Sequence, residues 1–136
     1  MKLYQYGEDM STPIENIRWC APEVVRGSSF SAQSDVWSYA MTCLELLGGK
    51  VPYSEISKDI NVFRAIDKGE LPNRPRTDTT LDGLSESVWL LLRRCWQIEP
   101  NSRLPISVVK TALQRIREGN LNYYLMIRVT ISPMIV

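Results

Sequence analysis

Histidine is missing from the sequence, and cysteine is scarce. None of the 136 residues is a histidine, which excludes the commonest general base and every metal site built on imidazole ligands. The three cysteines (Cys20, Cys43 and Cys95) form no C-x-x-C pair, so no zinc site is expected. An odd number of cysteines without an apolar leader is typical of a reducing compartment, and we expect a cytoplasmic protein.

Long apolar runs and an excess of charge are missing as well. No uninterrupted apolar stretch is long enough to cross a bilayer, so no membrane span is expected. The net charge is +1, which gives no reason to expect nucleic acid as a partner. With 44% hydrophobic and 23% charged residues, the chain has the composition of one globular domain with a core.

Helical patterns are what the sequence does contain. The strongest begins at Asp35 and ends at Leu47, with Ser34 as its expected N-cap and Gly48-Gly49 as its stop. Apolar residues occupy nearly all of its faces, which predicts a central and buried helix. No stretch alternates as a half-buried strand does, so the sequence predicts an all-α domain without a sheet of its own.

The remaining expected helices are short or amphipathic. In the one after residue 57, Ile60, Phe63 and Ile66 are expected on the inner side. Turn-forming residues fill 69–83, and 119–136 is rich in aromatic and branched residues without helix caps, so no structure is predicted for it. The expected helices span residues 22–25, 35–47, 57–68, 85–97 and 105–118.

Four motifs occur in order along the chain. They are IRWCAPE (17–23), SDVWSYA (34–40), VPY (51–53) and CWQIEPNSRL (95–104). They resemble the APE motif, the D-V-W-S helix, the G-x-x-P-[FY] turn and the C-W-x-x-x-P-x-x-R-P motif of tyrosine kinases and tyrosine-kinase-like kinases. Each is weak alone, but four at the right spacing are specific.

The resemblance implies the helical C-terminal lobe of the protein kinase fold, without the β-rich N-terminal lobe. Residues 1–13 would be a remnant of the activation segment, 14–118 a partial kinase domain, and 119–136 a tail of unknown structure. The structural motif residues carried over are Ala21, Pro22, Glu23, Asp35, Trp37 and Arg103.

Several of these residues have expected roles by resemblance. Glu23 would pair with Arg103 and clamp the activation segment to the helical lobe; the alternative is two unrelated surface charges. Asp35 would contact the catalytic loop in a full kinase, but here only the role of a helix-start acid is expected. Trp19 and Cys20 would line a substrate groove, although Trp19 would serve equally well as a core anchor. Cys95 and Trp96 are expected in the core.

The kinase motifs that bind ATP and transfer phosphate do not occur in the sequence. A Gly-rich G-x-G-x-x-G loop and any R-D dipeptide are absent, and Asp82-Gly83 lacks the phenylalanine of D-F-G. We therefore expect no catalytic, cofactor-binding or metal-binding residue in this chain, with ATP and Mg²⁺ belonging to the full family domain. The family reaction moves the ATP γ-phosphate to a protein Ser, Thr or Tyr hydroxyl, and the chain alone is expected to be inactive.

Two other hypotheses remain open. The chain could work with another chain that supplies the missing half, or it could be a non-catalytic interaction module that binds a protein substrate or docking protein through residues 57–69, with Phe63 as the residue to probe. In addition, part of the face formed by Val36, Tyr39, Ala40 and Cys43 is expected to lack a cover, which predicts self-association and marginal stability.

Overall fold

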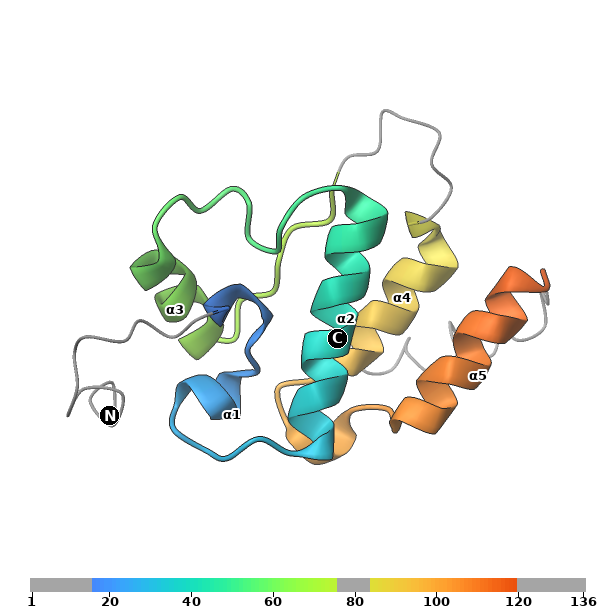
Figure 1. Cartoon of the computed structure of the whole chain (residues 1–136), viewed down its shortest axis with the longest axis horizontal. Helices are drawn as coiled ribbons and strands as arrows, with labels where there is room; N and C mark the ends of the chain where they lie inside the picture. Colours follow the sequence, from blue (N-terminus) through green and yellow to red (C-terminus); the bar gives the residue numbers. More distant parts are fainter. Residues whose placement is uncertain (1–15, 76–83, 120–136) are drawn as a thin grey trace.

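The computed structural model describes residues 16–75 and 84–119, and all its regular elements there are helical (Figure 1). No strand occurs in that part, which confirms the predicted all-α class. In chain order the elements are η1 (Ile17–Trp19), α1 (Pro22–Val25), α2 (Ala32–Gly48), α3 (Asp59–Asp67), α4 (Glu86–Cys95), η3 (Pro100–Ser102) and α5 (Ile106–Arg117).

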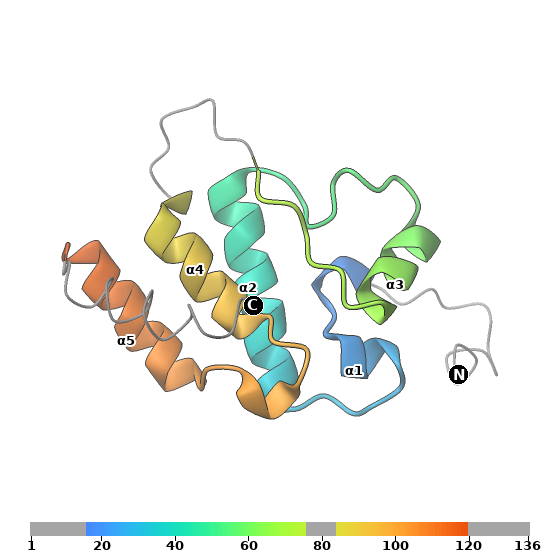
Figure 2. The same cartoon turned by 180° about the vertical axis from the view of Figure 1, so that it is seen from behind.

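Helix α2 is the centre of the molecule. In both views it stands between α4 and α5 on one side and α1 and α3 on the other (Figures 1 and 2). It contacts η1, α4 and η3, while α5 packs on α4 and α3 packs on η1 and α1. The predicted central position of this helix is confirmed.

The start of α2 differs from the prediction. Ser31 is the N-cap, not Ser34, and the helix begins three residues before Asp35. The two serines form a capping box: the Ser34 amide donates to Ser31 Oγ (3.1 Å) and the Ser31 amide donates to Ser34 Oγ (2.8 Å). At the other end, Gly49 has φ 74°, and its amide donates to the Glu45 carbonyl, as a left-handed C-terminal cap does.

Helix α2 has one exposed stripe, and the rest of its surface is buried or half-buried. Val36, Trp37, Ala40, Met41 and Leu44 are each at most 3% exposed. Of the face that was expected to be partly uncovered, Val36 and Ala40 are buried and Cys43 is half-buried. Tyr39 is 42% exposed, as expected. The exposed stripe of α2 consists of Ala32, Asp35, Tyr39, Thr42 and Leu46.

Helix α3 is rotated from the predicted orientation. Phe63 and Ile66 are buried as expected, together with Val62 and Ala65, but Ile60 is 49% exposed. The helix begins at Asp59, so Ile60 lies in its first turn, where it faces solvent. The inner stripe therefore runs through 62, 63 and 66 rather than through 60.

Helices α4 and α5 follow the sequence pattern closely. Ser85 caps α4 by accepting a hydrogen bond from the Val88 amide (3.3 Å), and Val88, Leu91, Leu92 and Cys95 are all buried. Helix α5 turns Val109 and Ala112 inward. The described residues do not include residues 1–13, the expected remnant of the activation segment, or residues 76–83 of the predicted loop. They also exclude most of the tail at 119–136. Within the described ranges, no helix is both long and apolar enough to cross a membrane.

Candidate functional site

A buried ion pair joins residues eighty positions apart in the sequence. Arg103 Nη1 donates to Glu23 Oε1 (2.6 Å), and Nη2 donates to Oε2 (2.8 Å). The Arg103 side chain is 0% exposed and that of Glu23 is 18% exposed. Two parallel bonds from a planar guanidinium fix the angle of the carboxylate as well as its distance. Pro22 at the start of α1 and the turn after η3 therefore present the two partners to each other.

The remaining donors of Arg103 are also used. Nε donates to the Gln97 carbonyl (2.9 Å), and Nη1 donates to the Gln33 carbonyl (3.0 Å). The guanidinium carbon lies 5.1 Å from the centre of the buried Trp37 ring, a cation–π contact. One side chain thus ties α1, α2 and the segment between α4 and α5 together. We call Glu23, Trp37 and Arg103 the clamp.

The turn before α1 carries the two candidate groove residues. Asn16, in the left-handed conformation with φ 64°, begins it. The Trp19 indole donates to Glu45 Oε2 (3.1 Å), and the Trp19 carbonyl accepts from the Ser38 hydroxyl (2.8 Å). Trp19 and Cys20 are both half-buried against the core. Trp19 is therefore anchored to α2 at its polar edge while part of its surface stays open.

Arg18 is a central residue of this turn that the sequence analysis missed. Its guanidinium donates to the carbonyls of Pro52 (3.2 Å), Tyr53 (2.8 Å) and Ile56 (2.9 Å), and it also pairs with Asp59 (3.0 Å) at the start of α3. The three acceptors are backbone atoms, so no residue type in the sequence marked them. Arg18 fixes the loop between α2 and α3 against the turn that holds Trp19.

Comparison with known proteins decides the family. The family described as protein tyrosine and serine/threonine kinase matches residues 2–113 of this chain. The chain belongs to this family. The four motifs, the clamp and the described helices as far as the middle of α5 lie within the matched range, and the resemblance inferred from sequence is confirmed.

A tyrosine-protein kinase and two receptors are among the similar proteins. The chain is 34% identical to the megakaryocyte-associated tyrosine-protein kinase of Mus musculus over 100 residues, 73% of the chain and 18% of the relative. It is 32% identical to the BDNF/NT-3 growth factors receptor of Gallus gallus, over 86% of the chain and 13% of the receptor. For macrophage colony-stimulating factor 1 receptor 1 of Takifugu rubripes the identity is 27%, over 76% and 10%. The chain thus spans less than a fifth of these relatives.

The other kinase-motif residues take structural positions. Ala21 and Pro22 are buried at the start of α1. Asp35 lies in the first turn of α2 on its exposed stripe, and its carboxylate makes no hydrogen bond or ion pair with another described residue. A first-turn acid is favoured by the helix dipole. Cys95 and Trp96 are 0% and 1% exposed, which confirms that they belong to the core.

Within 16–75 and 84–119, no group of three or more acidic or thiol side chains could hold a metal ion. The three thiols are free. Burial raises the pKa of Cys20 and of Cys43, and it raises the pKa of Cys95 to about 12. These thiols therefore stay neutral at physiological pH and are poor nucleophiles.

The ion pair of the clamp should make the free energy of unfolding fall as the pH is lowered into the acid range. Burial alone would raise the pKa of Glu23, but the hydrogen bonds and charge of Arg103, with a contribution from Arg26, lower it overall from its ordinary 4.5. A carboxyl whose folded-state pKa is lowered stabilises the fold above its unfolded pKa, and this contribution is lost as the pH falls through the folded-state value.

Glu23→Gln should therefore flatten the loss of stability below pH 4.5. The free energy of unfolding, measured by urea denaturation at a series of pH values, checks this. Glu99→Gln, at an exposed carboxylate, is the matched control and should keep the slope of the parent chain. Equal acid limbs in the parent and Glu23→Gln would contradict the account.

Proposed function

We propose that this chain is the helical scaffold of a protein tyrosine kinase catalytic domain, in which residues 14–118 form the partial kinase domain. The observation that carries the proposal is the clamp: Arg103 holds Glu23 by two hydrogen bonds and lies over Trp37. The clamp fixes the end of the activation segment, and the ties of Trp19 and Arg18 support the adjoining turn as part of a groove for a protein substrate.

The proposed scaffold is inactive by itself. Neither a Gly-rich loop, a catalytic-loop aspartate nor D-F-G occurs in the sequence, so ATP and Mg²⁺ would be held by residues that this chain does not contain. Its reaction, in a complete domain, is transfer of the ATP γ-phosphate to a protein hydroxyl. Free thiols at Cys20, Cys43 and Cys95 are consistent with a cytoplasmic location.

Titration calorimetry and a phosphotransfer assay test this inactivity. The full chain is mixed with Mg²⁺ and ATP, and with a tyrosine-containing peptide in the second assay. We expect neither saturable ATP binding nor labelled peptide. Saturable nucleotide binding that survives removal of contaminating kinases would overturn the proposal.

A second candidate function is that of an interaction module, and the exposure of Ile60 favours it. Ile60 points outward from the first turn of α3, within the proposed docking segment 57–69, while Phe63 is 7% exposed and belongs to the core. Ile60 is therefore a better probe than Phe63. Ile60→Asp should abolish the binding of a docking partner by the parent chain. Ile106→Asp is the matched control and should keep that binding, because Ile106 of α5 is 52% exposed, close to the 49% of Ile60. Retention by all three proteins would exclude α3 as the docking site.

Self-association is proposed through the exposed stripe of α2. Tyr39 and Leu46 lie seven residues apart on that stripe, and Leu46 is 77% exposed. Apolar side chains repeated at helical spacing favour pairing of two copies. Leu46→Lys should reduce concentration-dependent association in analytical ultracentrifugation, whereas Val108→Lys on α5 should not. A parent chain that stays monomeric at every concentration would refute this.

A further inference from the structure

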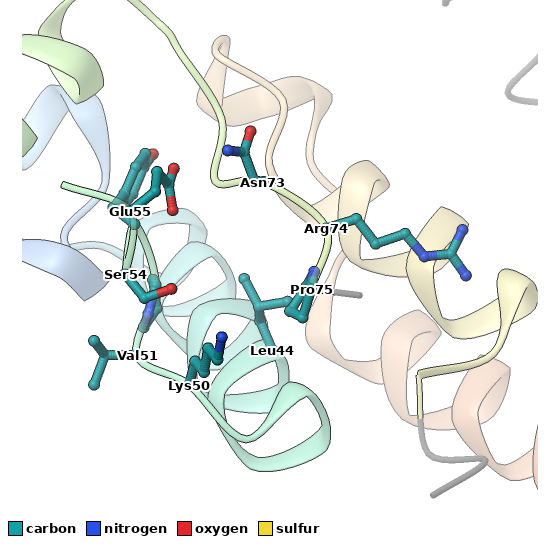
Figure 3. Close-up of a pocket in the computed structure, with 10 residues that line it drawn as sticks. Leu44, Lys50, Val51, Ser54, Glu55, Asn73, Arg74 and Pro75 are labelled. Carbon is teal, nitrogen blue, oxygen red and sulfur yellow. The ribbon is translucent and has the colours of Figure 1, made fainter. Parts of the chain in front are cut away.

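A small cavity opens where the end of α2 meets two loops. Its volume is about 160 Å³, and it is lined by residues 50–55 of the α2–α3 loop, by 73–75, and by Leu44 of α2 (Figure 3). Pockets for drug-sized molecules occupy about 300–1,000 Å³, whereas an apolar cavity of about 150 Å³ accommodates one benzene-sized group. The cavity therefore has the size of a single large apolar side chain.

The base of the cavity is apolar and tightly built. Leu44 is 1% exposed, and its side chain lies close to Pro75 among the lining residues (Figure 3). Pro75 also packs closely against Gly48 at the end of α2. Only glycine fits there, because a Cβ on residue 48 would lie 2.7 Å from Pro75 Cγ. The proline rings of Pro52 and Pro75 bring no backbone N–H to this base. Leu44, Val51, Pro52 and Pro75 therefore give the lining an apolar part beside its polar groups.

The walls of the cavity are held in place from outside. Arg18 binds the carbonyls of Pro52 and Tyr53, and the Tyr53 hydroxyl donates to the Glu70 carbonyl (2.8 Å). Tyr53 itself has φ 56°, a conformation that a non-glycine residue adopts only when its surroundings enforce it. On the other wall, Arg74 pairs with Glu86 and lies 5.5 Å from the Trp89 ring. A pre-formed cavity lowers the ordering cost of binding.

Unused polar groups surround the opening. Lys50, Ser54, Glu55 and Asn73 are exposed, and none makes a side-chain hydrogen bond or ion pair with another described residue. In Figure 3 the ammonium group of Lys50 lies at one end of the opening and the carboxylate of Glu55 at the other, with Asn73 nearer to Glu55. The rim therefore offers one cationic end and one anionic end across an apolar base.

We propose that this cavity is an anchor site for an extended segment of a partner protein. One leucine-sized side chain of that segment fills the cavity, an acidic neighbour meets Lys50, and a basic neighbour meets Glu55 and Asn73. Interfaces commonly concentrate their affinity in one apolar anchor within such a pocket, surrounded by a polar rim. The cavity lies outside the 57–69 docking segment and needs no phosphotransfer, so the inference stands independently of the proposed function.

Nuclear magnetic resonance of the ¹⁵N-labelled full chain tests the proposal. The probe is an acetylated and amidated peptide, Gly-Asp-Leu-Lys-Gly. We expect saturable shifts of the backbone amides of residues 50, 51, 53–55, 73 and 74. The shifts should disappear when serine replaces the leucine of the peptide, and weaken when asparagine and glutamine replace its aspartate and lysine.

Substitutions in the protein identify the cavity and its charged rim. Ser54→Trp should block the opening and abolish binding, and Lys50→Glu should weaken it about tenfold by placing like charges together. Lys110→Glu makes the same charge change on exposed α5 and should bind as the parent does; circular dichroism checks that each variant is folded. The absence of saturable shifts, equal binding of the leucine and serine peptides, or undiminished binding by folded Ser54→Trp would overturn the proposal. Undiminished binding by Lys50→Glu would overturn its charge assignment.

Discussion

Replacing Arg103 with alanine is expected to lower the free energy of unfolding by about 3–5 kcal/mol, the range for breaking one side of a buried ion pair. The carboxylate of Glu23 would lose both of its guanidinium hydrogen bonds while remaining only 18% exposed. The carbonyls of Gln33 and Gln97 would lose donors as well. The free energy of unfolding of single domains is about 5–15 kcal/mol, so the loss of Arg103 would remove a large part of it.

Urea denaturation followed by tryptophan fluorescence measures the effect. Arg117→Ala removes an exposed arginine from the last turn of α5 and is the matched control, with an expected change within about 0.5 kcal/mol. Arg103→Lys keeps the charge but loses the planar guanidinium. Its free energy of unfolding should therefore lie between those of Arg103→Ala and Arg117→Ala. A double-mutant cycle with Glu23→Gln isolates the pair. An Arg103→Ala variant as stable as the parent would show that the clamp is not structural.

Replacing Trp37 with alanine is expected to lower the free energy of unfolding by about 3–5 kcal/mol. Trp37 is 1% exposed at the centre of α2, where its removal leaves a cavity and also takes away the ring beneath Arg103. Trp37→Phe should cost less than Trp37→Ala, because it leaves a smaller cavity and keeps an aromatic face there. The indole N–H that it removes has no hydrogen-bond partner among the described residues.

The same denaturation experiment distinguishes a packing role from a general loss of aromatic surface. Trp89→Ala is the control, since Trp89 of α4 is only half-buried and should be less costly to remove. Equal losses for Trp37→Ala and Trp89→Ala would contradict the central place of Trp37. A loss for Trp37→Phe as large as that for Trp37→Ala would show that the indole itself, and not its aromatic bulk, is required.

Local patterns in the sequence were enough to predict the helices and most of the core. Helical spacing of apolar residues placed Val88, Leu91 and Cys95 inward on α4, and they are buried. The same reasoning failed at Ser34 and Ile60. The cap is Ser31 rather than Ser34, because the Ser31 side chain accepts the hydrogen bond from the Ser34 amide. Ile60 is exposed because α3 begins only at Asp59 and buries Val62, Phe63, Ala65 and Ile66 instead.

The site was predictable only where a motif connected distant residues. Glu23 and Arg103 were paired through their resemblance to two kinase motifs, since periodicity carries no information over eighty positions. The ties of Arg18 were not foreseen, because backbone carbonyls look alike in any sequence. The bond from Trp19 to Glu45 was not foreseen either, because no pattern in the sequence connects two residues 26 positions apart.

A chimeric kinase tests the central claim most directly. Residues 14–118 replace the matching segment of the mouse megakaryocyte-associated tyrosine-protein kinase, to which the chain is 34% identical, and phosphate transfer to a tyrosine-containing peptide is measured. We predict that the chimera transfers phosphate, that Arg103→Ala in the chimera abolishes the transfer, and that Arg117→Ala leaves it unchanged. A folded chimera without transfer, or one indifferent to Arg103→Ala, would contradict the assignment of this chain as a kinase scaffold held by the clamp.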